Sequence, residues 1–330
     1  MTWPNEWGPL LAGAAVVALA FLAALPWLVR PLFRLLLWPR YTIRVRGLEH
    51  LPRTGPALLA ANHVTWIDGF LLTAACPRRG KALVNASYIN WPGFRHLARW
   101  VGLIPVPSSG PRAQRAAIDA VRAALDRGEA VAIFPEAQLS RVGLTGPFYR
   151  GLEVMLSKRE AVPVIPVFLD NLWGSLFSFS GGVTFRKRPQ GLRRAVGIAF
   201  GAAIPPPIIA FAVRQGVLEA GVRAFELRRG PSRPLETLDP ALPRWEHPEL
   251  GLLAASTADF HGGGVEQKGQ KPGSLGLPPP GVALRVVDDS GAPLPPDSQG
   301  RVQALLAGRP DFVETGRQGR LDRDGFLTLT

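Results

Sequence analysis

Short apolar segments alternate with helical segments between residues 41 and 201, and this alternation constrains the fold more than any other feature. The segments with strand character are YTIRVR (41–46), ALLAAN (57–62), KALVNA (81–86), IPV (104–106), AVAIFPE (130–136), VPVIPVFL (162–169) and RRAVGIAFG (193–201). The segments with helical character are 65 to about 75, PGFRHLARWVG (92–102), RAQRAAIDAVRAALDR (112–127) and FYRGLEVMLSKR (148–159). Strands that alternate with helices predict an α/β layer structure.

The pattern changes after about Pro207. Residues 210–229 predict one more helix, and residues 230–250 form a proline-rich linker. The remainder is strand and turn material rich in Gly, Pro and Asp. We therefore expect an N-terminal segment (1–40), an α/β domain (41–229), the linker (230–250) and a small β-rich C-terminal unit (251–330).

The first 40 residues contain an uncharged apolar run from Gly8 to Val29. This length matches the ~20 residues needed to cross a bilayer, so the sequence predicts an N-terminal membrane helix. Arginines follow the run and only Glu6 precedes it, which places the C-terminal side in the cytoplasm. A cleaved signal peptide is the alternative, but the run lacks a basic region before it.

The charge balance points to an anionic partner. The formal net charge is +13, and residues 30–115 hold 13 Lys or Arg against two acidic residues. Basic residues next to an apolar segment favour membrane lipids over nucleic acid. The single Cys76 excludes an internal disulfide and suits a reducing compartment, and the scattered His residues predict no metal site.

The stretch ANHVTWIDGF (61–70) places a histidine and an aspartate five positions apart, where a strand ends and a helix begins. Asp68 can turn back towards His63, fix its tautomer and leave the other ring nitrogen free as a base. A second interpretation gives Thr65 and Asp68 only helix-capping roles and leaves His63 as a satisfied histidine. This stretch alone favours neither interpretation.

A second stretch, FPEAQLSR (134–141), follows a buried strand. Together, NHVTWID and FPEAQLSR resemble the N-H-x4-D and F-P-E-G-T-R-S signatures of the glycerolipid acyltransferase family. VGLIPV (101–106) and VPVIPV (162–167) resemble two further blocks of that family, in its order. The resemblance covers residues 40–207 and implies the acyltransferase-type mixed sheet flanked by helices.

The resemblance also implies a reaction. His63 would be the general base that deprotonates the free hydroxyl of a lysophospholipid, and Asp68 would orient it. The acyl chain would come from acyl-CoA or acyl-carrier protein as co-substrate, with no cofactor. The acceptor would be 2-acylglycerophosphoethanolamine or lysophosphatidic acid, at the cytoplasmic side of a membrane, as in a bacterial inner membrane.

The same resemblance implies a set of substrate-binding residues around this pair: Asn62, Phe134, Pro135, Glu136, Arg141, Arg112 and Arg115. Arg112 and Arg115 begin a helix and can bind phosphate, although solvated helix arginines are an equal alternative. The third motif departs from the family, because Ala137 replaces its glycine and Leu139 stands where its arginine is expected.

The sequence EAQLSR resembles the variant found where the acyltransferase is fused to an acyl-acyl carrier protein synthetase. In agreement, 271–302 and 319–330 resemble parts of the adenylate-forming synthetases. The phosphate loop and catalytic lysine of that family are missing, so we expect a degenerate fragment. Two other functions compete: a Ser–His–Asp lipid hydrolase, which lacks a G-x-S-x-G elbow here, and a non-catalytic membrane-anchored scaffold that binds lipid or acyl-carrier protein.

Overall fold

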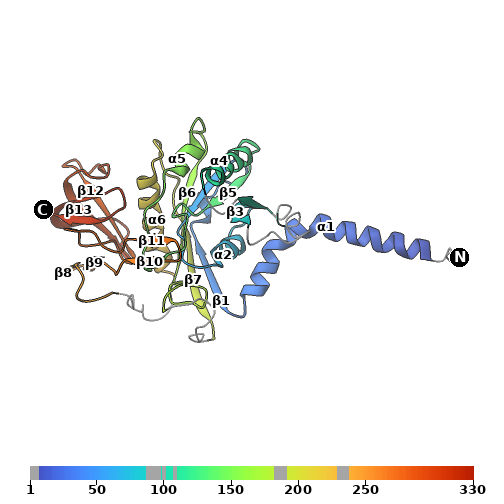
Figure 1. Cartoon of the computed structure of the whole chain (residues 1–330), viewed down its shortest axis with the longest axis horizontal. Helices are drawn as coiled ribbons and strands as arrows, with labels where there is room; N and C mark the ends of the chain where they lie inside the picture. The colour runs from blue at the N-terminus through green and yellow to red at the C-terminus, as the bar shows by residue number, and fades with distance from the viewer. Residues whose placement is uncertain (1–6, 87–97, 99–101, 107–109, 182–191, 229–237) are drawn as a thin grey trace.

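The computed structural model describes residues 7–86, 98, 102–106, 110–181, 192–228 and 238–330 (Figure 1). Its central part consists of β1 (Tyr41–Arg46), η1 (Leu48–His50), β2 (Ala57–Ala61), α2 (Asp68–Ala75), β3 (Gly80–Asn85), β4 (Leu103–Val106), α4 (Pro111–Asp126), β5 (Ala130–Ile133), α5 (Gly151–Leu156), β6 (Val164–Asp170), β7 (Arg194–Phe200) and α6 (Ala210–Phe225). This alternation confirms the predicted α/β architecture. The helix predicted over 92–102 falls almost entirely outside the described residues.

Seven strands form one sheet in the order β1-β7-β6-β2-β5-β3-β4. β6, β2, β5, β3 and β4 run parallel, and β1 runs parallel to β7. Only the β6–β7 junction is antiparallel among the described strand pairs of this sheet. The sheet is therefore mixed and mostly parallel, as predicted. The carboxyl ends of β2, β5 and β6 meet at one edge, where the predicted motif residues follow the strands.

Apolar side chains cover both faces of this sheet. In β2, Leu59 packs with α2 residues such as Leu71 on one face. Leu58 packs with α4 and α6 residues such as Val121 and Val217 on the other face. Successive strand residues point to opposite faces, so a fully apolar strand such as ALLAA must be covered on both sides. This explains why the strands lack alternating polar residues.

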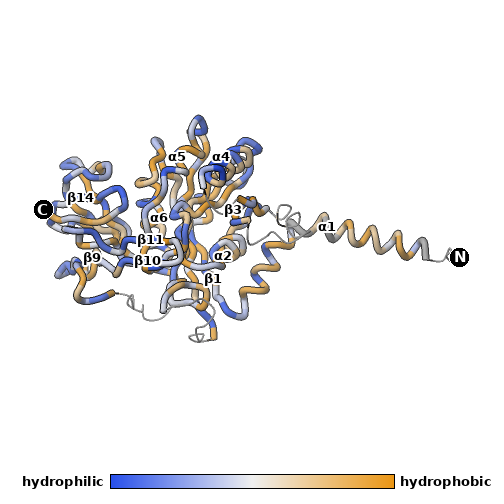
Figure 2. Tube along the Cα trace, in the orientation of Figure 1, coloured by the Kyte–Doolittle hydropathy of each residue, from blue (hydrophilic) through white to orange (hydrophobic). Residues whose placement is uncertain are grey.

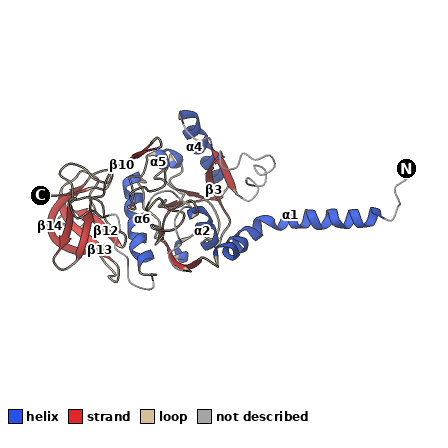
Figure 3. Cartoon of the chain, turned by 60° about the horizontal axis from the view of Figure 1, so that its bottom comes forward, coloured by secondary structure: helices blue, strands red, loops and turns tan. Residues whose placement is uncertain are grey.

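The C-terminal unit consists of short antiparallel strands, which are β8 (Arg244–His247), β9 (Gly251–Ala255), β10 (Phe260–Gly262), β11 (Val265–Gln267), β12 (Val282–Val287), β13 (Gly300–Leu306), β14 (Val313–Leu321) and β15 (Leu327–Leu329). β12 to β15 form one sheet. α6 lies between this sheet and the seven-stranded sheet (Figures 1 and 3). Leu218 and Val222 of α6 pack against Ala283 and Leu305, so α6 belongs to both cores.

Two element boundaries differ from the prediction. α2 begins at Asp68 without a side-chain cap, because Thr65 uses its hydroxyl to bind the Asp68 carboxylate instead. α5 begins at Gly151 rather than near residue 148, and the Tyr149 N–H that precedes it donates to the Pro135 carbonyl at 3.0 Å. β8 occupies the end of the predicted linker, so that part is ordered by pairing with β9.

The helix α1 (Trp7–Leu37) precedes the sheet and projects from the rest of the molecule (Figure 1). Apolar residues run along it (Figure 2). Within the described residues, however, no helix meets the length and apolarity that a membrane crossing requires, so the predicted N-terminal membrane helix is not confirmed. Arg34, one of the arginines that follow the apolar run, donates from Nε to the Ala74 carbonyl of α2 at 2.9 Å.

Candidate active site

His63 and Asp68 meet in the turn between β2 and α2. Asp68 is the first residue of α2, and its side chain folds back over the turn. Its Oδ2 accepts hydrogen bonds from His63 Nδ1 at 3.0 Å, from the Val64 N–H at 2.6 Å and from the Thr65 N–H at 2.8 Å. Its Oδ1 accepts the Thr65 hydroxyl. The turn is thus built around a single carboxylate.

This arrangement fixes the tautomer of His63. A carboxylate can only accept hydrogen bonds, so the ring nitrogen that faces Asp68 must carry the proton. The unprotonated nitrogen is then Nε2, which is free to act as a base. The Asp68 side chain is completely buried, whereas the His63 side chain is 23% exposed. A reagent can reach the imidazole without reaching its partner.

The Phe134 ring packs against one face of the His63 imidazole. The two rings stack with centroids 4.0 Å apart and an angle of 15° between their planes. Phe134 also lines a cavity of about 80 Å³ whose other walls include Phe33, Leu59 and Leu72. An apolar space therefore begins beside the candidate base.

Glu136 is buried next to the turn that carries His63. Its Oε1 accepts the backbone N–H of His63 at 2.8 Å, and its Oε2 accepts that of Gly146 at 3.0 Å. Burial raises the pKa of Glu136 to about 7, although both N–H groups, the charge of His63 and the charge of Arg214 favour the carboxylate. Glu136 connects two backbone segments and holds the main chain of the candidate base.

The raised pKa of Glu136 makes stability depend on pH. The folded pKa of about 7 lies above the ordinary value of 4.5, so the folded state binds the proton more tightly than the unfolded state. The free energy of unfolding should therefore fall as pH rises from about 4.5 to about 7, by about 3 kcal/mol from this group.

Urea unfolding of wild type and Glu136→Gln between pH 4.5 and 8 measures this effect. We expect the difference in unfolding free energy between the two proteins to change over that range. Glu246→Gln is the control, because Glu246 is exposed. Parallel pH curves for wild type and Glu136→Gln would contradict the assignment.

The side chain of Asn62 points towards the neighbouring strand β6 and bonds its backbone. Its side-chain Oδ1 accepts the Leu169 N–H at 2.7 Å, and its Nδ2 donates to the Leu169 carbonyl at 3.2 Å. The amide therefore imitates one more backbone pair between β2 and β6. This explains why an asparagine precedes the histidine; the substrate contact expected of Asn62 stays a prediction.

Arg141 is stacked between aromatic rings. Its guanidinium carbon lies 3.2 Å from the ring centre of Phe179 and 5.0 Å from that of Phe260. Burial lowers the pKa of Arg141, and its Nε is buried with no hydrogen-bond partner among the described residues. Ala137, in the position of the motif glycine, has a φ of 54°, a left-handed conformation that glycine adopts without strain. The loop keeps a glycine-like backbone despite the substitution.

The remaining predicted residues lie further from the imidazole. Pro135 is buried behind the motif and accepts the Tyr149 N–H. Arg112 and Arg115 lie exposed on the first turns of α4. α4 follows β4, so its N-terminus lies at the same sheet edge as His63, but no contact between these arginines and His63, Asp68 or Glu136 is seen within the described residues. Their substrate-binding role stays a prediction.

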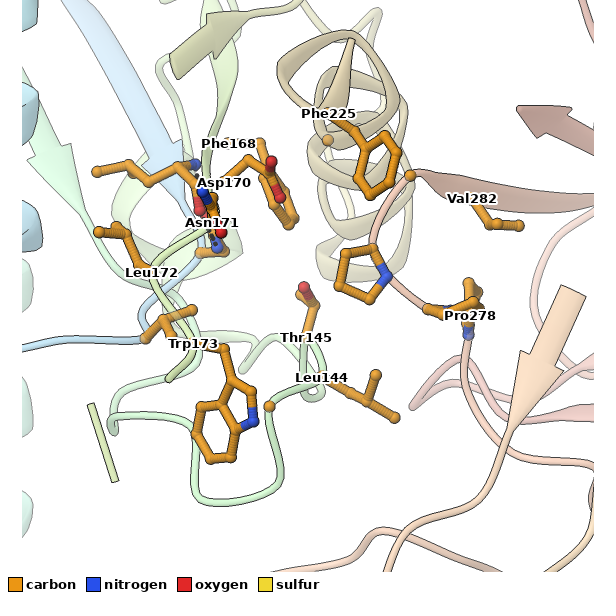
Figure 4. Close-up of a pocket in the computed structure, with 18 of the residues that line it drawn as sticks. Leu144, Thr145, Phe168, Asp170, Asn171, Leu172, Trp173, Phe225, Pro278 and Val282 are labelled. Carbon is orange, nitrogen blue, oxygen red and sulfur yellow. Dashed lines mark hydrogen bonds between the residues drawn. The ribbon is translucent and has the colours of Figure 1, made fainter. Parts of the chain in front are cut away.

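A larger cavity of about 290 Å³ lies between the α/β domain and the C-terminal unit (Figure 4). Phe168, Trp173 and Phe225 form apolar walls, and the segment 278–282 closes the opposite side. Asn62 and Val64, the two neighbours of His63, also line it. In the part of the chain that the structure describes, His, Cys, Asp and Glu side chains form no group of three that could hold a metal ion, and the predicted absence of a cofactor stays a prediction.

Sequence reasoning missed Arg214. It lies on α6, is 1% exposed, and donates to the carbonyl groups of Thr145 and Gly146 at 2.9 Å. A single arginine on an otherwise apolar helix face was a visible signal, because an arginine is almost never fully buried without partners. Its partners are distant in sequence, so the pattern of α6 alone does not identify them.

Comparison with known proteins finds acyltransferases that are similar to part of this chain. A model of the acyltransferase family, described as "Acyltransferase", matches residues 42–170. The chain is 27% identical over 134 residues to a chloroplastic 1-acyl-sn-glycerol-3-phosphate acyltransferase of Brassica napus, covering 40% of this chain and 38% of that protein. It is 29% identical over 185 residues to the lyso-ornithine lipid O-acyltransferase of Rhizobium meliloti, covering 54% of this chain and 60% of that protein.

Among solved structures, the 1-acyl-sn-glycerophosphate acyltransferase PlsC of Thermotoga maritima is similar at 20% identity and a TM-score of 0.46. That similarity covers 64% of this chain and 81% of that chain. The chain thus spans about two fifths of the Brassica napus relative and three fifths of the Rhizobium meliloti relative. The matched segment contains His63, Asp68 and Glu136.

Proposed function

We propose that this protein is an O-acyltransferase that acylates the free hydroxyl of a lysophospholipid, since a model of the acyltransferase family matches residues 42–170. The donor is the thioester of acyl-CoA or acyl-carrier protein. The observation that carries the proposal is the hydrogen bond between His63 Nδ1 and Asp68 Oδ2, because it leaves Nε2 free as the base.

The proposed reaction is a direct acyl transfer. His63 Nε2 takes the proton of the acceptor hydroxyl while the hydroxyl oxygen attacks the thioester carbonyl. The new C–O bond forms, the C–S bond breaks, and the leaving thiolate takes the proton back from the imidazolium. Asp68 stabilises the imidazolium during this sequence, since a carboxylate beside the ring favours its charged form.

The surroundings of His63 support lipid substrates. The cavity beside Phe134 is lined mostly by apolar side chains, with Thr73 and Lys81 among them, and is suited to the part of an acyl chain next to the reacting carbonyl. Trp66 and Phe70, which flank the turn, are 39% and 44% exposed. Exposed aromatic residues beside a site favour contact with a lipid chain rather than with water.

Arg141 supports an anionic headgroup. Its guanidinium lies in a loop whose Ser140 N–H is bound to the His63 carbonyl at 2.8 Å, so the loop is tied to the candidate base. Of the two relatives, one is named for a glycerol phosphate acceptor and the other for a lyso-ornithine lipid. We favour a phosphate headgroup, either lysophosphatidic acid or 2-acylglycerophosphoethanolamine, because a guanidinium in a loop tied to the candidate base can pair with a phosphate.

One panel of assays tests this function. Purified protein is offered lysophosphatidic acid, lysophosphatidylethanolamine or lyso-ornithine lipid, each with acyl-CoA and with acyl-carrier protein. We expect acyl transfer to at least one phosphate-bearing acceptor, and a rate at least tenfold lower with the lyso-ornithine lipid. A preference for the lyso-ornithine lipid would contradict the headgroup assignment.

If neither donor transfers an acyl chain to any of the three acceptors, the proposed acyltransferase function is wrong. That result would favour the alternative, a scaffold that binds lipid or acyl-carrier protein. Retention of a lysolipid on the protein without turnover would identify that case. The location at the cytoplasmic side of a membrane stays a prediction.

A further inference from the structure

Arg214 is a fully buried cation, and its contacts define what it holds. Its Nε donates to the Gly146 carbonyl and its Nη2 to the Thr145 carbonyl, each at 2.9 Å. Two donors of one rigid guanidinium fork thus hold two successive carbonyl groups in a fixed relative orientation. Arg214 therefore sets the orientation of the segment 145–146.

That segment reaches the candidate base through one carboxylate. The Gly146 N–H donates to Glu136 Oε2, and the His63 N–H donates to Glu136 Oε1. A displacement of Gly146 moves Glu136, and Glu136 holds the backbone of His63. The contacts thus run without a gap from Arg214 to the residue that carries the base.

The C-terminal unit closes over the other side of Arg214. Gly325, in the turn between β14 and β15, has a φ of +87°, and a Cβ atom there would lie 2.0 Å from Arg214 Nη1 and 2.4 Å from its Cζ. The same turn carries Asp322 and Asp324, whose charges favour the arginine cation, and both bind Lys271 Nζ. The turn is therefore shaped to fit the guanidinium.

A second contact joins the same unit to the motif loop. Gln267 of β11 accepts the Arg141 N–H at 2.6 Å through Oε1 and donates to the Leu139 carbonyl at 2.9 Å through Nε2. Phe260 of the paired strand β10 lies against the Arg141 guanidinium. The hairpin β10–β11 is thus bonded to the loop that follows Glu136.

We propose that the C-terminal unit is a working part of the acyltransferase site: Gly325 seats Arg214, and Arg214 is a positioning residue that holds Glu136 and the backbone of His63. This inference rests on the proposed function. It gives the β-rich unit a role in the reaction of the neighbouring domain that needs no chemistry of its own.

The first test compares two alanine substitutions in the full chain. Gly325→Ala places a methyl group against Arg214. Gly291→Ala is the matched control, because Gly291 has a φ of +86° in the same unit and a Cβ there would meet nothing within 4 Å. We expect kcat for acyl transfer to fall about 10- to 100-fold in Gly325→Ala, with little change in KM, and to stay near wild type in Gly291→Ala.

The second test separates positioning from simple loss of structure. The charged groups that face Glu136 are His63 and Arg214, and those that face Arg214 are Glu136, Asp322 and Asp324. Protonation of Glu136 removes an acceptor for the N–H groups of His63 and Gly146 and should therefore lower kcat on the acid side. Arg214→Met removes a charge that favours the Glu136 carboxylate, so this acid limb of the kcat profile should move to higher pH. Arg214→Lys keeps the charge, so its acid limb should stay in place while kcat falls.

Circular dichroism first verifies that each variant is folded, and kcat is measured only on folded protein. Equal kcat in wild type and Gly325→Ala, or equal losses in Gly325→Ala and Gly291→Ala, would overturn the inference. The same acid limb in Arg214→Met and Arg214→Lys would also overturn it. If wild type itself transfers no acyl chain in the panel, the proposed function fails instead, so the two failures are distinguishable.

Discussion

Replacing His63 by alanine should lower the rate of acyl transfer by about 10²- to 10⁴-fold, the range expected when a general base is removed. The reason is that Nε2 is the group that takes the hydroxyl proton, and alanine offers no replacement. The variant should still fold, because the side chain is partly exposed and makes one side-chain hydrogen bond among those seen, to Asp68. The measurement is the initial rate with the best donor and acceptor of the panel.

His261→Ala is the control for this variant, since His261 is 66% exposed on β10 and only approaches Glu266 at 4.0 Å. It should keep wild-type activity. The binding of lysolipid should persist in His63→Ala, because the base acts on the reaction and not on the lipid chain. Wild-type activity in His63→Ala would show that His63 is not the general base of the reaction.

Replacing Asp68 by alanine should cost both activity and stability. The change leaves the buried N–H groups of Val64 and Thr65 and the Thr65 hydroxyl without their shared acceptor. Each such group costs about 1–3 kcal/mol when it loses its partner. The rate should fall by at least about 10³-fold as well, because the tautomer of His63 is no longer fixed.

Asparagine at position 68 separates the charge from the geometry. Its carbonyl can replace Oδ2 and accept the same three donors. Its amide can replace Oδ1, because the Thr65 hydroxyl can rotate and accept instead of donating. Asp68→Asn should therefore fold nearly as well as wild type, while its rate falls about 100-fold through loss of imidazolium stabilisation.

Thermal unfolding and initial rates of the two Asp68 variants check this contrast. The melting temperature should fall clearly in Asp68→Ala and little in Asp68→Asn. Wild-type rates in Asp68→Asn would mean that the carboxylate charge takes no part in the reaction. Wild-type stability in Asp68→Ala would contradict the hydrogen bonds assigned to the turn.

The strands and the candidate base could be predicted because they depend on local sequence. ALLAA is apolar at every position, which indicates a strand covered on both faces, and His63 and Asp68 lie within one turn of each other. The start of α2 was harder to predict. Thr65 is an ordinary capping residue, but a buried carboxylate three positions later competes for its hydroxyl.

The parts that sequence could not predict depend on distant contacts. Arg214 is one charge on an otherwise apolar face of α6, and its partners Thr145 and Gly146 come almost 70 positions earlier. Gly325 reads as an ordinary turn glycine, and only the fold brings it against Arg214. The membrane helix was predicted from the length of an uncharged apolar run and the charges that flank it, and the described residues do not confirm it.

The pairing of β1 with β7 affects how the chain is made. Arg46 at the end of β1 pairs with Ala199, so the first strand has no partner until about 150 more residues have been synthesised. At ribosomal rates this wait lasts roughly 8–30 s. An unpaired strand is open to wrong partners during that time, and the charges of Arg44 and Arg46 discourage pairing between neighbouring nascent chains. The basic residues of β1 would thus protect the newborn protein from aggregation before its sheet is complete.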